Sequence, residues 1–260
     1  MGEKYFSSEY RDKVEIITIT RPKVLNALNS DLMKELKEAF LRFKDDKDRR
    51  VLIITGQGEK AFSAGADIPG LLGRHIFEEK RGILSGQDTL TTLEGLGKPS
   101  IAAINGYALG GGLELAIACT FRLASPNARL GVPEIKLGLI PGYGGTQRLL
   151  RMVGQIKALE MVLLGSSMTA QEGERLGLIY KVVDQDKLMD ECLKLADELC
   201  KKSPLTISLA MEAVLRGRDV ALKDGLALEA DLGTIAFNTE DCKEGLTAFL
   251  EKREPKFKGR

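Results

Sequence analysis

Short apolar segments alternate with amphipathic segments along the first half of the chain. Four segments are predicted as strands from their β-branched and apolar residues, at 14–20, 51–55, 100–105 and 121–125. After the first strand, residues 30–46 repeat apolar side chains at helical spacing, and these are Leu32, Met33, Leu36, Ala39, Phe40 and Phe43. Continuously apolar strands joined by helices are typical of buried parallel sheets. The pattern therefore predicts an α/β fold built from βαβ units.

The second half of the chain is predicted to be mostly helical. Helices are expected at 144–153 and 155–164, and one strand at 178–183. Thr169 with Glu172 forms a capping-box pattern that opens a further helix, and Ser203 with Pro204 is a typical helix start. The final stretch, 221–253, carries apolar residues on more than one helix face. Such faces pack either on the same chain or on a second subunit, and the pattern alone does not separate the two.

The charge and cysteine content exclude several classes of function. The 260 residues include 38 Lys and Arg against 37 Asp and Glu, a net charge of +1 that does not favour nucleic acid or a membrane surface as the main partner. No apolar stretch approaches the roughly 20 residues of a membrane span, and the N-terminal residues lack a signal-peptide pattern. The four cysteines have no CxxC spacing, and only one histidine is present. We therefore expect a soluble cytoplasmic protein with reduced thiols and no metal site.

Two glycine-bearing loops are candidates for binding an anionic oxygen through the backbone. The segment 62–67 (FSAGAD) is a row of small residues after a strand. The segment 105–114 (NGYALGGGLE) joins a strand to a helix that is predicted to start near Gly111, where the first N–H groups are free and lie at the positive end of the helix dipole. Neither matches a dinucleotide-binding or phosphate-binding loop, and the chain has no G-x-S-x-G elbow. The second loop is therefore predicted to stabilise an oxyanion.

Two glutamates lie among apolar residues and glycines where helices are expected to begin. Glu114 follows Gly111 by three residues, which places both on one helix face, and Glu134 follows Pro133. A single glutamate in the first turn of a helix is explained by the helix dipole alone. Burial of two carboxyl groups is costly and raises their pKa, so the pair predicts divided acid and base roles.

At these residues the sequence resembles the enoyl-CoA hydratase (crotonase) family. The resemblance covers nearly the whole chain through the motifs RPKVLNALN, AFSAGADI, KPSIAAINGYALGGGLELA, PEIKLGLIPGYGGTQRLLRMVG, MTAQEGERLGLIYKVV and FLEKREPKFK. It implies a core of repeated ββα units in residues 1–195 and a C-terminal helical region in 196–260 that forms trimers. Trimers of the family commonly pair into hexamers, so the resemblance implies either a trimer or a dimer of trimers. It also implies the reversible addition of water to a 2-enoyl-CoA in fatty acid metabolism. Coenzyme A is then part of the substrate, and no separate cofactor is expected.

The resemblance assigns roles residue by residue. Glu114 matches the family's base and Glu134 its acid, while the amides of Ala64 and Gly111 match the donors to the thioester oxygen. Gly142 matches the position that helps to hold the water molecule. Contacts with coenzyme A or substrate are implied at Lys23, Ala27, Ala64, Gly65, Ala66, Asp67, Phe249 and Lys252, the last two acting from a neighbouring subunit.

Two other functions stay open on the same scaffold. Double-bond isomerisation needs only one acid–base residue, so the presence of both glutamates favours the hydratase. A scaffold or RNA-binding relative is disfavoured by the intact glutamates and the near-zero charge. Residues 69–95 are expected to border the acyl pocket, but they show no pattern that predicts the acyl chain. His75 lies within them and is interpreted as a surface residue.

Overall fold

The computed structural model describes residues 5–260 and divides its strands between two sheets. The longer sheet has the order β1-β2-β3-β5-β7-β10, from β1 (Phe6–Arg11), β2 (Val14–Ile19), β3 (Val51–Gly56), β5 (Ser100–Ile104), β7 (Phe121–Ala124) and β10 (Lys181–Val182). Only β1 pairs antiparallel in it. The shorter sheet has the order β4-β6-β8-β9, from β4 (Ala61–Ser63), β6 (Tyr107–Leu109), β8 (Arg129–Gly131) and β9 (Ser167–Thr169).

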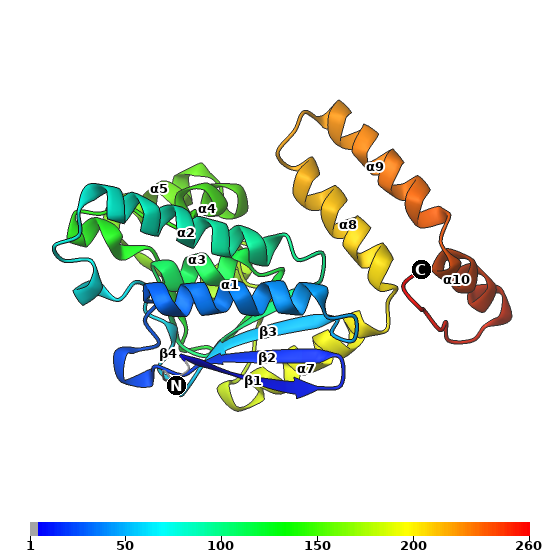
Figure 1. Cartoon of the computed structure of the whole chain (residues 1–260), viewed down its shortest axis with the longest axis horizontal. Coiled ribbons are helices and arrows are strands. Elements are labelled where there is room, and N and C mark those ends of the chain that lie inside the picture. The colour runs from blue at the N-terminus through cyan, green and yellow to red at the C-terminus, as the bar shows by residue number, and fades with distance from the viewer. Residues whose placement is uncertain (1–4) are drawn as a thin grey trace.

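The helices cover the long sheet on both faces and continue beyond it. The helices of the core are α1 (Ser30–Asp45), α2 (Ile76–Glu94), α3 (Gly111–Ala118), α4 (Gly145–Val153), α5 (Gln155–Leu164), α6 (Ala170–Arg175) and α7 (Leu188–Cys200). The last three helices are α8 (Pro204–Gly217), α9 (Leu222–Phe237) and α10 (Glu240–Glu251). Short 3-10 turns are η1 (Pro22–Val24), η2 (Ile68–Gly70), η3 (Pro133–Leu137) and η4 (Gln185–Lys187). Figure 1 shows α1, α2 and α3 on one side of the strands and α7 on the other.

Three strand pairs give the core its repeated ββα character. Along the chain, β3 and β4, β5 and β6, and β7 and β8 each contribute one strand to the long sheet and one to the short sheet. The strands β4, β6 and β8 are parallel neighbours, so their carboxyl ends meet at one edge of the short sheet. The segments that follow these ends, at 64–67, 110–114 and 132–134, are therefore brought together. The predicted α/β class and the ββα repeat are confirmed.

Two apolar clusters hold the long sheet between its helices. One lies between the sheet and α1 to α3 and includes Leu36 and Phe40, which are fully buried. The other lies between the sheet and α7 and includes Ile53 and Cys192. Asn29 caps α1 by accepting a hydrogen bond from the amide of Leu32, which satisfies one of the free donors at the helix start.

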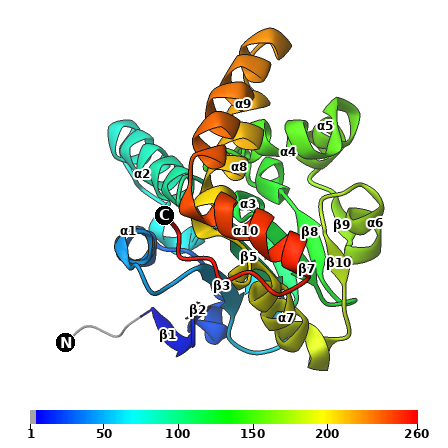
Figure 2. The ribbon, with the colours of Figure 1, turned by 90° about the vertical axis from the view of Figure 1, so that its right-hand side faces the viewer.

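The C-terminal helices leave the core after α7. Figures 1 and 2 show α8 and α9 running away from the sheets as an antiparallel pair, with α10 beyond them. The boundary predicted between residues 195 and 196 falls inside α7, which packs against the sheet, and the division into two domains stays a prediction. Apolar side chains on these last helices are exposed, and they include Leu222, Phe237, Phe249 and Leu250. Within residues 5–260, no helix has both the length and the apolar character required for a membrane span.

Candidate active site

Glu114 is buried in the first turn of α3 and is held by a neighbouring loop. The residue is only 1% exposed to solvent. The Oε1 atom accepts hydrogen bonds from the amides of Tyr143 at 2.8 Å and Gly145 at 2.7 Å. The pKa of Glu114 is raised to about 7, mainly by burial and also by the nearby charge of Glu134, while the hydrogen bonds from the two amides and the charge of Arg148 lower it. Glu114 is therefore poised to exchange a proton near neutral pH.

Glu134 lies in η3, close to the start of α3. A Cβ atom added to Gly110 would lie 2.9 Å from its Oε1 atom. Its Oε2 atom is buried and has no hydrogen-bond partner among residues 5–260. Burial raises the pKa of this carboxyl group too, which favours its protonated form. The structure thus brings the two predicted glutamates together, and the charge of one acts on the other.

The backbone at the start of α3 presents a free amide. Gly111 is the first residue of α3, so its N–H has no partner within the helix. A Cβ on Gly65 would lie 3.2 Å from the nitrogen of Gly111, and Gly65 has a φ of +95°, a conformation that favours glycine. Glycine at 65 therefore allows the segment 64–67 to approach the start of α3.

The prediction that Ala64 donates to the thioester oxygen is wrong. The amide of Ala64 donates to the carbonyl of Leu25 at 2.9 Å, so it is already satisfied inside the protein. The next amides donate elsewhere as well, Gly65 to the Ser63 hydroxyl and Asp67 to the carbonyl of Leu28. Among residues 64–67, only Ala66 has an N–H without a partner in the described chain. Ala66 is therefore the amide of this segment that is free to pair with Gly111.

The edge of the short sheet also holds a cavity on the Ala66 side. It has a volume of about 490 Å³, and its lining includes Leu28, Ala66, Asp67, Arg74 and Tyr143. The Tyr143 ring packs against Gly86 of α2, where a Cβ atom would overlap the ring. This cavity adjoins the free amide of Ala66. Sequence reasoning did not identify Tyr143, although its place in the PGYGG loop was a usable signal.

The remaining predicted site residues fall into two groups. Arg21 connects the loop that carries Lys23 and Ala27 to the small-residue segment, because it donates to the carbonyl of Ala27 and to Asp67 at 2.7 Å. Lys23 is exposed and Ala27 is buried. Phe249 and Lys252 belong to the end of α10, which Figure 1 shows far from α3. A single chain does not bring these two residues to the glutamates.

Two further predictions concern His75 and Gly142. His75 is exposed and caps α2, with its Nδ1 accepting from the amide of Phe77 at 3.4 Å, so its interpretation as a surface residue is confirmed. Gly142 lies in the loop that holds Glu114, and its carbonyl accepts from Gln87 at 2.9 Å. The role of Gly142 in holding water stays a prediction. In the part of the chain that the structure describes, no three His, Cys, Asp or Glu side chains gather as potential metal ligands.

Comparison with known proteins gives one consistent result. The family model for enoyl-CoA hydratase/isomerase matches residues 9–260. The chain is 42% identical to the short-chain-enoyl-CoA hydratase of Clostridium acetobutylicum, over 95% of this chain and 94% of that one. It is also 42% identical to the crotonyl-CoA hydratase of Syntrophomonas wolfei, over 96% of each. The crystal structure of an enoyl-CoA hydratase from Bacillus anthracis has a TM-score of 0.95 at 38% identity, over 98% of this chain and 100% of that one. The chain belongs to the enoyl-CoA hydratase/isomerase family.

Proposed function

We propose that this protein is an enoyl-CoA hydratase, which adds water reversibly to a 2-enoyl-CoA to give a 3-hydroxyacyl-CoA. The observation that carries the proposal is the pairing of Glu114 with Glu134 beside the free amides of Ala66 and Gly111. An isomerase needs one proton-transfer group, whereas hydration needs a base for water and an acid for carbon. The site has both.

The chemistry follows from where charge develops. Glu114 in its ionised form takes a proton from water, and the resulting hydroxide attacks the β-carbon. The electron pair of the double bond moves toward the thioester carbonyl, whose oxygen acquires enolate charge. The amides of Ala66 and Gly111 stabilise that charge, and one such donor contributes roughly 3 kcal/mol. Glu134 in its protonated form, favoured by its buried and unpartnered Oε2 atom, then delivers a proton to the α-carbon. Coenzyme A enters and leaves as part of the substrate.

A hydration assay with crotonyl-CoA tests the proposal directly. We expect the absorbance of the conjugated thioester to fall and 3-hydroxybutyryl-CoA to appear, at a kcat of at least about 1 s⁻¹, the lower end of the usual range for enzymes. A 3-enoyl-CoA offered in parallel reports isomerisation. Conversion of the 3-enoyl-CoA alone would assign the site to an isomerase. No turnover on any enoyl-CoA of a panel, together with binding to RNA, would assign the chain to the non-catalytic relatives.

The pH dependence of hydration is predicted by the pKa of Glu114. As the base, Glu114 must be ionised, and burial raises its pKa to about 7. The kcat/KM is therefore expected to fall as the pH decreases through about 7, and by about tenfold for each further pH unit. As the acid, Glu134 must be protonated, and burial raises its pKa too, so loss of its proton is expected to give a second fall in kcat/KM as the pH rises further. Measurement of kcat/KM from about pH 5 to about pH 10 tests this, and activity that stays constant from about pH 5 to 7 would contradict the base role.

We also propose that the active form is a trimer or a dimer of trimers. Support comes from the exposed apolar side chains of α9 and α10, among them Leu226, Ile235 and Leu246, because such faces mark subunit interfaces. A neighbouring subunit then brings Phe249 and Lys252 toward the coenzyme A groove beside Lys23 and the segment 64–67. We place the protein in the cytoplasm, where unpaired thiols persist, since its four cysteines are all free.

A further inference from the structure

The loop at residues 141–145 is the only source of hydrogen bonds to Glu114 Oε1 in the described chain. The donors are the amides of Tyr143 and Gly145. Backbone amides hold a carboxylate firmly only if the loop that carries them has a fixed orientation. The question is therefore which side chains fix this loop.

Gln87 fixes the first peptide unit of the loop. Its Nε2 atom donates to the carbonyl of Gly142 at 2.9 Å. That carbonyl and the N–H of Tyr143 belong to the same planar peptide unit, so a constraint on one orients the other. A donor on the carbonyl also polarises the peptide and strengthens its N–H as a donor. Gln87 lies on α2, beside Gly86, where the Tyr143 ring packs.

Arg148 fixes the next peptide unit, which joins Tyr143 to Gly144. Its Nη1 atom donates to the carbonyl of Tyr143 at 3.0 Å. Its Nη2 atom forms an ion pair with Glu94 Oε2 at 3.0 Å, and Nε lies 3.3 Å from the same oxygen. The two side chains are 11% and 19% exposed, so water screens this pair less than it screens a surface pair. Arg148 is thus held in place by Glu94 while it holds the loop.

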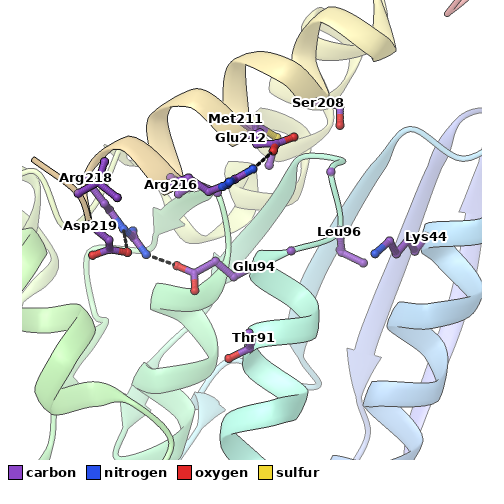
Figure 3. A pocket seen from close by; sticks show the side chains of 14 residues that line it. Lys44, Thr91, Glu94, Leu96, Ser208, Met211, Glu212, Arg216, Arg218 and Asp219 are labelled. Carbon is purple, nitrogen blue, oxygen red and sulfur yellow. Dashed lines mark hydrogen bonds and ion pairs between the residues drawn. The ribbon is translucent and has the colours of Figure 1, made fainter. Parts of the chain in front are cut away.

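Glu94 extends this connection to the C-terminal helices. Its Oε1 atom accepts from Arg218 at 2.8 Å, at the C-terminal end of α8. Figure 3 shows the Arg218 side chain pointing toward Glu94, and both residues line a cavity of about 650 Å³ together with Asp219. The hydrogen bonds therefore run without a break from the region that leaves the core to the loop that holds Glu114.

We propose that Gln87 and Arg148 are positioning residues for Glu114, with Glu94 holding Arg148 in place. They act by clamping two successive carbonyls of the 141–145 loop. Gln87 orients the amide of Tyr143 directly, and Arg148 fixes the Tyr143–Gly144 peptide unit, which lies between the two amides that donate to Glu114. This inference rests on the proposed hydratase function, in which Glu114 is the base. Neither residue needs to contact the substrate.

The charges around Glu114 give the proposal a measurable signature. Glu134 raises its pKa, while Arg148 and the two loop amides lower it. Loss of Arg148 removes a nearby positive charge and loosens the amides, and both effects raise the pKa of Glu114. The acidic limb of the pH profile should then move to higher pH. Loss of Gln87 should move it in the same direction by a smaller amount, because Gln87 is neutral.

The test compares Arg148→Met and Gln87→Met with matched controls on the same helices. Arg151→Met removes an arginine of α4 that pairs with Asp219 and does not contact the loop. Asp88→Asn changes the residue next to Gln87 in the chain. Asp88 forms an ion pair with Lys37 at the surface. We expect kcat to fall about 10- to 100-fold in the two test variants, because a misplaced catalytic group lowers the rate by about this factor. The KM should change by less than about threefold. The acidic limb should shift upward only in those variants, and Arg148→Lys should restore part of kcat and most of the limb.

Hydrogen exchange of the loop separates this proposal from the proposed function. Amides within residues 139–147 should exchange faster in the two test variants than in the wild type and the controls, whether or not the protein is a hydratase. If the wild type showed no hydration activity but the two test variants still exchanged faster than the wild type, the proposed function would be refuted and the role of Gln87 and Arg148 in fixing the loop would be supported. The positioning role would be overturned if Arg148→Met and Gln87→Met kept the wild-type kcat, the wild-type acidic limb of the pH profile and the wild-type hydrogen exchange of the loop. An equal loss in the controls would also overturn it, because that would indicate a general structural effect.

Discussion

Replacement of Glu114 or Glu134 by glutamine is expected to lower the kcat for hydration at least about 100-fold. Glutamine at 114 keeps an oxygen that can accept from Tyr143 and Gly145, so the loop geometry is preserved. It cannot take a proton from water, however. Glutamine at 134 fills the same space beside Gly110 but has no acidic proton for the α-carbon. Each change thus removes proton transfer while the shape of the site stays the same.

The control for these variants is Glu160→Gln. Glu160 is an exposed glutamate of α5 that pairs with Lys157, and its replacement should leave kcat within about twofold of the wild type, as is usual for surface substitutions. Stability gives a second check. The pKa of Glu114 is raised on folding, so its contribution favours the folded state at low pH and is lost as the pH rises through about 7. Glu114→Gln should therefore melt no lower than the wild type above neutral pH. Wild-type turnover in either test variant would refute the role of that residue.

The elements that could be predicted from the sequence are those with a clear local pattern of apolar residues. The strands β2, β3, β5 and β7 are short and apolar, and α1 has a clear buried stripe from Leu32 to Phe43. The helix α2 was not predicted because the buried residues of its 19-residue length include a glycine and a threonine, Gly86 and Thr89, so no apolar stripe marks it. The strands of the short sheet have three residues each, too few to show a period.

The candidate site shows a similar division. Glu114 and Glu134 were identifiable because burial of a carboxyl group among apolar residues and glycines costs free energy, so its presence there indicates a function. The sequence does not show whether the amide of Ala64 or that of Ala66 is free, because this depends on which amides bond to the loop that contains Leu25 and Leu28. That pairing joins segments distant in the sequence. The assignment transferred from the family motif fell on Ala64, whose amide is already bonded to Leu25, two residues before the free amide of the same segment.

Gln87 and Arg148 show why supporting residues escape sequence reasoning. Each acts on a backbone carbonyl of a loop, so no pattern of residue types links it to Glu114. Gln87 is separated from Gly142 by 55 positions, and Arg148 from Glu94 by 54. Both contacts arise from the packing of α2 against the loop and α4.

Replacement of Gly111 by proline is expected to lower kcat about 100- to 1,000-fold, the usual loss when one oxyanion donor is removed. The position is favourable for the experiment because Gly111 is the first residue of α3, where proline is well accepted and where the N–H makes no bond within the helix. Proline therefore deletes the amide hydrogen without breaking the helix. Gly110, which precedes it, has a φ of +52° and no side chain to clash with the ring.

The matched control is Gly111→Ala, which adds a Cβ atom but keeps the N–H. That Cβ would lie 3.3 Å from the Tyr143 ring and 3.4 Å from the Leu28 side chain, a tight fit that small shifts of those side chains relieve. We expect it to lose less than about tenfold in kcat, well below the loss from an absent donor. Ala64→Gly, at an amide already bonded to Leu25, should also retain most of the activity. Equal losses in Gly111→Pro and Gly111→Ala would indicate that space at the start of α3, and not the amide hydrogen, limits the reaction.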